Sequence, residues 1–106
     1  MEIESPAEIK VFVVQVLGLV QILYSEFGLS REQIVKIVMR GMNPYVTELI
    51  RGFMKEIVLM ETRTVRSETK EQIVQQIQQL FITHVDKYSA KPFLKKMCQE
   101  RGITYG

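Results

Sequence analysis

The sequence is poor in the side chains on which most catalytic sites depend. Its 106 residues include one histidine, His84, one cysteine, Cys98, and a single aspartate, Asp86. Acid–base and nucleophilic catalysis require several titratable groups that converge on one point. His84 and Asp86 are two residues apart, so on a helix their side chains point in different directions. Glycine-rich phosphate loops and metal-ligand spacings are also missing, so we expect a non-catalytic protein that needs no metal and no cofactor.

The single cysteine excludes an internal disulfide bond, which favours a reducing compartment such as the cytoplasm. The N-terminus carries Glu2 and Glu4 where a signal peptide would have basic residues. The most apolar run, Val11 to Tyr24, is 14 residues long and contains Gln15 and Gln21. Because a membrane span needs about 20 apolar residues, we expect a buried helix in a cytoplasmic protein, with no membrane contact and no small-molecule substrate.

The net charge of the chain is also small. The net charge is +2, and the composition is 46% hydrophobic and 25% charged, as in ordinary globular proteins. Residues 1–30 carry a net charge of −3, residues 31–66 of +3 and residues 67–106 of +2. This balance is too mild to predict a polyanionic partner by itself. The length predicts a single domain, residues 1–106.

Apolar residues recur at helical spacing between clear helix-start and helix-stop signals. Ser30 begins the capping box S-R-E-Q, and Ser5-Pro6 and Asn43-Pro44 each pair a capping residue with a proline at the first helical position. Gly28, Gly41 and Gly102 are the stop signals. We therefore predict an all-α fold, a compact bundle of about five helices at approximately 6–27, 31–40, 44–60, 68–87 and 90–101.

The first predicted helix has apolar residues on two of its sides. One broad arc supplies a core face, and on the opposite side Val11, Val14 and Ile22 lie beside Gly18 among glutamines rather than charged residues. Charged residues are depleted at the centres of protein interfaces, and the fourth predicted helix is also rich in glutamine. The predicted protein interface comprises Val11, Val14, Gln15, Gly18 and Ile22, together with Gln75, Gln79 and Ile82. The alternative is that the first helix is the centre of the bundle and is covered on all sides by its own chain.

Residues 30–57 resemble a helix-turn-helix unit in texture, but the fit is incomplete. Tyr45, Glu48, Arg51 and Lys55 would face outward on its second helix, although Glu48 would repel phosphate. The predicted nucleic-acid contacts are Arg40, Tyr45, Arg51, Lys55, Arg63 and Arg66. A second basic cluster, Lys87, Lys91, Lys95, Lys96 and Arg101, is more typical of a solvated surface.

Three functions follow from these patterns. The first is a cytoplasmic helical module that binds protein, as a homodimer or as the subunit of an assembly. The alternative is a regulatory DNA-binding domain that uses residues 30–57. The third is a chaperone or inhibitor of a specific protein that uses the turn between Met39 and Met42, because flexible thioether side chains suit adaptable binding surfaces.

Overall fold

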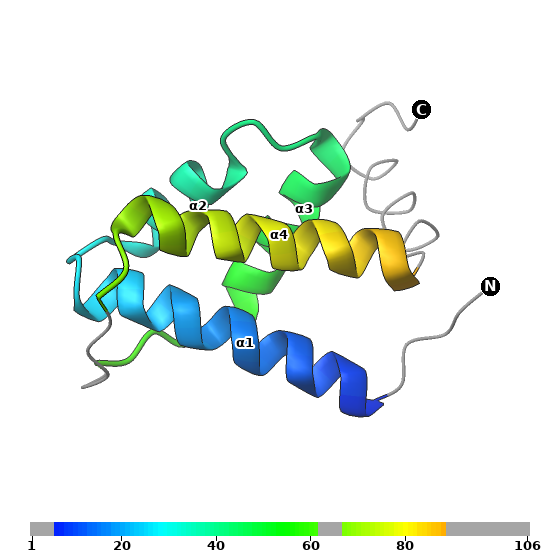
Figure 1. The fold of residues 1–106 in the computed structure, drawn as a ribbon, viewed down its shortest axis with the longest axis horizontal. Helices are drawn as coiled ribbons and strands as arrows, with labels where there is room; N and C mark the ends of the chain where they lie inside the picture. Colours follow the sequence, from blue (N-terminus) through cyan, green and yellow to red (C-terminus); the bar gives the residue numbers. More distant parts are fainter. Residues whose placement is uncertain (1–5, 62–66, 89–106) are drawn as a thin grey trace.

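The computed structural model describes residues 6–61 and 67–88, which form four α-helices. These are α1 (Pro6–Ser25), α2 (Arg31–Met39), α3 (Pro44–Glu56) and α4 (Lys70–Tyr88). Helices α1 and α4 lie side by side and run in opposite directions, and α3 passes behind α4 (Figure 1). The prediction of an all-α fold is confirmed. The fifth predicted helix, residues 90–101, lies outside the described residues.

All four helices contribute to one apolar core. Val16, Val20 and Leu23 of α1 are buried against it, and Phe12 places its ring edge-to-face with Phe53 of α3 and Phe81 of α4. The other buried apolar residues are Leu19, Ile22, Ile34, Val38, Val46, Ile50, Met54, Ile57, Ile73, Val74 and Ile77. Helix α1 packs most extensively against α4. The core therefore joins the first described helix to the last one.

The helix starts follow the capping signals of the sequence. The Ser30 side chain accepts a hydrogen bond from the Gln33 amide at 3.2 Å, and the Gln33 side chain accepts one from the Ser30 amide at 2.8 Å. The Asn43 side chain accepts from the Val46 amide at 3.0 Å, which confirms the predicted cap of α3. Thr69 and Gln72 form a second reciprocal pair before α4. The motif T-K-E-Q at residues 69–72 is therefore a capping box that the prediction of a start near residue 68 missed.

The prediction that the third helix extends to residue 60 is wrong, because α3 ends at Glu56 and Ile57 adopts an extended conformation. Two side chains bind the main chain beyond that point. Arg31 donates a hydrogen bond to the Ile57 carbonyl at 2.6 Å. Gln21 donates to the Val58 carbonyl at 2.8 Å and accepts from the Met60 amide at 2.6 Å. These bonds hold residues 57–60 close to α1 and α2.

Candidate protein-binding groove

An apolar groove of about 660 Å³ lies between α1 and α4. Helix α1 supplies its wall at one-turn intervals through Val14, Gly18 and Ile22, and α4 supplies the opposite wall through Leu80 and Thr83. The remaining lining residues are Gln15, Leu19, Gln21, Gln76 and Gln79. The structure thus brings together five of the eight residues predicted as a protein interface: Val14, Gln15, Gly18, Ile22 and Gln79.

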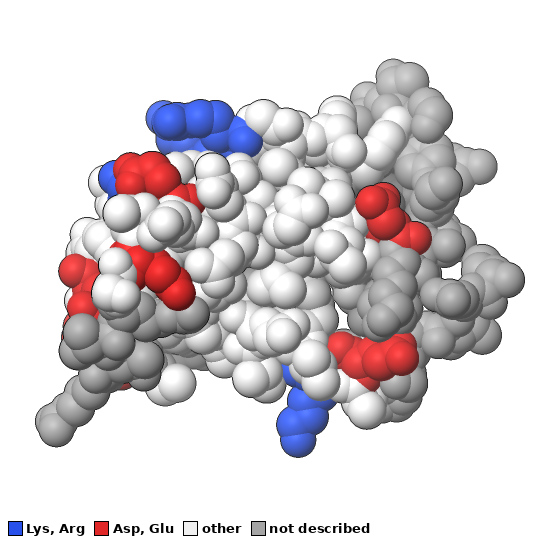
Figure 2. Space-filling view, viewed as in Figure 1, with Lys and Arg blue, Asp and Glu red and all other residues white. Residues whose placement is uncertain are grey.

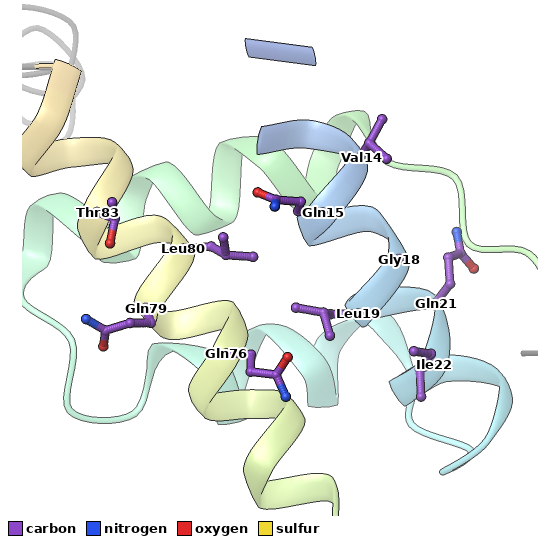
Figure 3. A pocket seen from close by; sticks show the side chains of 10 residues that line it. All are labelled: Val14, Gln15, Gly18, Leu19, Gln21, Ile22, Gln76, Gln79, Leu80 and Thr83. Carbon is purple, nitrogen blue, oxygen red and sulfur yellow. The ribbon is translucent and has the colours of Figure 1, made fainter. Parts of the chain in front are cut away.

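The side chains that face into the groove come from both helices. In Figure 3, Leu19 of α1 and Leu80 of α4 point toward each other, and Gln15 and Gln76 flank them. Leu19 is buried and Leu80 half-buried, so they form an apolar floor beneath polar but uncharged amides. Such a floor favours an apolar ligand surface, and the amides at its rim offer hydrogen-bond donors and acceptors.

None of the ten residues that line the groove is charged. Figure 2 shows that the acidic and basic side chains of the described residues lie near the edges of this face and leave its middle uncharged. An uncharged centre with a charged periphery is typical of the central part of a protein interface. None of the groove's lining residues carries a positive charge that would attract phosphate or another small anion.

Predicted interface residues differ in how far the bundle covers them. Val11 and Val14 are 56% and 57% exposed, whereas Ile22 is only 4% exposed. Ile22 therefore belongs to this chain's own core and only borders the groove, so the expectation that it lies uncovered is wrong. Gln75 is exposed on α4, and Ile82 is half-buried. Neither of these two lines the groove.

Helix α1 also exposes apolar side chains toward its N-terminal end. Ile9 and Val13, together with Val11 and Val14, leave more than a third of their surface uncovered. By length and composition, residues Ala7–Ser25 also meet the criteria for a membrane span, with a mean hydropathy of 1.7. However, Val16, Val20 and Leu23 of the same helix are packed in the core of the bundle. The core thus covers one side of α1 from Val16 to Leu23, whereas residues 7–11 are exposed on all sides of the helix.

Some of the glutamines have structural roles that the sequence did not reveal. The buried Gln21 binds residues 58 and 60. Gln78 donates to the carbonyls of Val38 and Arg40 at the end of α2, at 3.0 and 3.1 Å. Gln15, Gln75 and Gln79 remain exposed. Some of the glutamines of α4 therefore serve in helix capping and packing, and only the others are free to form a docking surface.

The proposed helix-turn-helix unit is formed by α2 and α3, which are joined by a turn at Gly41 with a positive φ of 78°. Glu48 does not face outward: it is 1% exposed, and its carboxylate accepts a hydrogen bond from Arg51 at 2.7 Å. Arg40, Arg51 and Lys55 are exposed, and Tyr45 is half-buried. Arg63 and Arg66 lie outside the described residues. Two of the predicted outward-facing residues of α3, Arg51 and Lys55, therefore present an exposed basic surface.

His84, the one histidine of the sequence, belongs to an aromatic cluster. The His84 imidazole stacks on Phe12 with ring centroids 4.0 Å apart and an interplanar angle of 19°. Partial burial lowers the pKa of His84 because desolvation disfavours the charged form. In the described part of the chain, no three acidic, histidine or cysteine residues come together as a metal site. Cys98 lies outside it.

Comparisons with known proteins give no match: no family model fits the chain, no curated protein is similar to it, and no solved structure matches its fold. The chemistry of the groove therefore has to be inferred from its own residues. Its features are an apolar floor, an uncharged rim and a glycine at the middle of one wall.

Proposed function

We propose that the protein is a cytoplasmic, non-catalytic protein-binding module that self-associates through the α1–α4 groove. The observation that carries this proposal is the apolar, uncharged groove, which continues into the exposed Val11 and Val14. In a two-fold dimer, α1 and α4 of each copy would face those of the other and complete a bundle of four helices. Each copy would then cover the apolar surface that the other leaves exposed.

The size of this face is sufficient for a dimer. A typical stable interface buries about 800 Å² on each partner, and the chain has an accessible surface of 6870 Å². Helices α1 and α4 have 20 and 19 residues, so each is about 30 Å long at a rise of 1.5 Å per residue. Two such helices side by side, about 10 Å apart, present a face on the scale that a dimer needs.

Gly18 supports a close approach of the partner helix. It is exposed within α1, it lines the groove, and apart from its chain neighbours and the adjacent helix backbone an added Cβ would meet no atom of this chain within 4 Å. The chain's own packing thus gives no reason for a glycine at this helical position, where glycine lowers helix stability by about 1 kcal/mol relative to alanine. A glycine on an interface lets two helix backbones come close together.

The test is the molar mass of the full chain over a wide concentration range, measured by sedimentation or light scattering. We expect a concentration-dependent dimer that Val14→Lys converts into a folded monomer, because the substitution places a charge in an apolar interface. The matched control is Val58→Lys, since Val58 is 70% exposed and does not line the groove. Ile22→Glu is unsuitable as a test because Ile22 is buried in the monomer core.

Two outcomes would contradict self-association. A chain that stays monomeric at high micromolar concentration would do so, and so would a dimer that Val14→Lys leaves intact. Sedimentation with lipid vesicles distinguishes the membrane alternative for α1. If the wild-type chain partitions onto vesicles and Val14→Lys abolishes this without any change in molar mass, then α1 binds lipid rather than protein.

DNA binding through α3 is the second candidate function. It is favoured by the exposed Arg51 and Lys55 and by the burial of Glu48, which removes a carboxylate from the outward face of α3, and it is disfavoured by the partial burial of Tyr45. In this case Arg51→Ala combined with Lys55→Ala would weaken DNA affinity and reduce its dependence on salt. Absence of a shift with duplex DNA at low salt would exclude it.

A further inference from the structure

A second groove, of about 330 Å³, lies between α2 and α3 and differs from the first one in its charge. Val35 and Met39 of α2 and Met54 of α3 supply its apolar surface. Its other lining residues are Arg31, Glu32, Lys36, Arg51 and Lys55, so four cations and one carboxylate surround it. Because α2 and α3 are distinct from the α1–α4 groove, both surfaces are available on one molecule.

Two of these cations are held in place by the fold. Arg51 is bound to the buried carboxylate of Glu48 at 2.7 Å, and its side chain remains 49% exposed. Arg31 donates to the Ile57 carbonyl at 2.6 Å. A cation that is fixed by such a bond loses less side-chain entropy when a ligand arrives. Lys36 and Lys55 are exposed and lie on different helices.

The apolar surface of this groove is suited to a side chain rather than to a phosphate backbone. Methionine is flexible and adapts to the shape of an inserted apolar group, and Met39 is half-buried at the groove while Met54 is buried beneath it. An amphipathic helix places apolar residues at i, i+3, i+4 and i+7 in such a groove. Acidic residues beside that stripe would then meet the cations of α2 and α3.

We propose that the α2–α3 groove binds an acidic amphipathic helix of another protein. The apolar residues of that helix contact Val35 and Met39, and its carboxylates pair with Lys36, Arg51 and Lys55. This interaction does not depend on self-association through α1 and α4. A protein with both surfaces would present the basic groove once on each subunit of an assembly.

The experiment uses the full chain and a fluorescently labelled helical peptide, with leucines at i, i+3, i+4 and i+7 and glutamates elsewhere. We expect saturable binding by fluorescence anisotropy. Lys36→Glu combined with Lys55→Glu should weaken it at least about tenfold, because both new carboxylates repel the peptide. The matched control is Lys10→Glu combined with Lys70→Glu, which changes the net charge equally outside the groove. Circular dichroism checks that each variant is folded.

Two comparison ligands make the result specific. A peptide with serine in place of each leucine should bind at least about tenfold more weakly, since the apolar contacts are lost. Equal binding of this peptide would show simple ion exchange and overturn the proposal. Duplex DNA that binds more tightly than the acidic peptide and displaces it would identify a nucleic-acid surface instead. Failure of the acidic peptide to bind, or binding that Val14→Lys rather than the lysine reversals removes, would also overturn it.

Discussion

Individual buried polar residues fix the path of the segments that connect the helices, because their side chains bind the main chain of those segments. Gln21 is buried near the C-terminal end of α1, and its side-chain amide group binds the Val58 carbonyl and the Met60 amide in the segment after α3. Nothing in the sequence distinguishes this glutamine from Gln15, which is exposed two turns earlier on the same helix. Its partners are 37 and 39 residues away. Such a role depends on tertiary structure and cannot be predicted from helical periodicity.

We predict that Gln21→Ala lowers the free energy of unfolding by about 1–3 kcal/mol, because two hydrogen bonds of about 1 kcal/mol each are lost. Urea denaturation of the monomeric Val14→Lys background would measure this without a contribution from association. The matched control is Gln75→Ala, which removes an exposed glutamine and should change stability by less than about 0.5 kcal/mol. Equal effects of the two substitutions would show that the Gln21 bonds contribute nothing.

His84 makes the stability of the fold depend on pH. Burial lowers its pKa in the folded protein below the unfolded value of about 6.5. The unfolded chain therefore binds the proton first, and stability should fall as the pH decreases through 6.5 toward the folded-state pKa. We predict a lower melting temperature at pH 5 than at pH 7.5.

The His84→Gln variant should lose this part of the pH dependence, because glutamine does not titrate. The difference in melting temperature between the two proteins, followed by circular dichroism from pH 5 to pH 8, separates the histidine from the carboxylates. A difference that stays constant over this range would contradict the assigned direction of the His84 pKa.

At the scale of whole helices, local capping signals predicted starts better than ends. Ser30 and Asn43 act within three residues of their own helices, so their roles are visible in the sequence. The end of α3 depends on Arg31 and Gln21, which bind the main chain from other helices. The apolar run Ile57-Val58-Leu59-Met60 contains no stop signal, so the sequence predicts that the helix continues through it.

We predict that Ser30→Ala lowers stability by about 0.5–2 kcal/mol, because the Gln33 amide loses its acceptor at the start of α2. The control is Ser67→Ala, which removes an exposed hydroxyl outside the helices. Thermal unfolding of both variants would measure the difference. If the Ser30 substitution is as neutral as the Ser67 substitution, solvent replaces the cap without loss.

At the scale of the whole molecule, the bundle covers its core but leaves one side of α1 open. The sequence predicted surplus apolar surface on α1, and the structure places Val14, Gln15, Gly18 and Gln79 around one groove. Helical spacing could not show that Ile22 turns into the core while Val11 and Val14 do not. That difference depends on where α4 crosses α1, which is a property of tertiary packing.

Gly18→Ala should separate folding from association. We predict that it stabilises the monomer by about 0.5–1 kcal/mol, since alanine is the better helix former and an added Cβ meets no atom of this chain within 4 Å apart from its chain neighbours and the adjacent helix backbone. The same methyl group should weaken the dimer if two α1 backbones meet at this point. Unfolding in the Val14→Lys background measures the first effect, and sedimentation of Gly18→Ala alone measures the second. A more stable monomer with unchanged dimerisation would place the helix contact elsewhere.

The pairing of α1 with α4 also bears on how the chain is made. Val16, Val20 and Leu23 are covered in part by Ile73, Ile77 and Phe81, which the ribosome adds some fifty residues later. In a nascent chain that ends before residue 70, the apolar surface of α1 is therefore exposed, because α4 has not yet been made to bury it. Such an intermediate is prone to aggregate or to recruit chaperones until the last of these helices emerges.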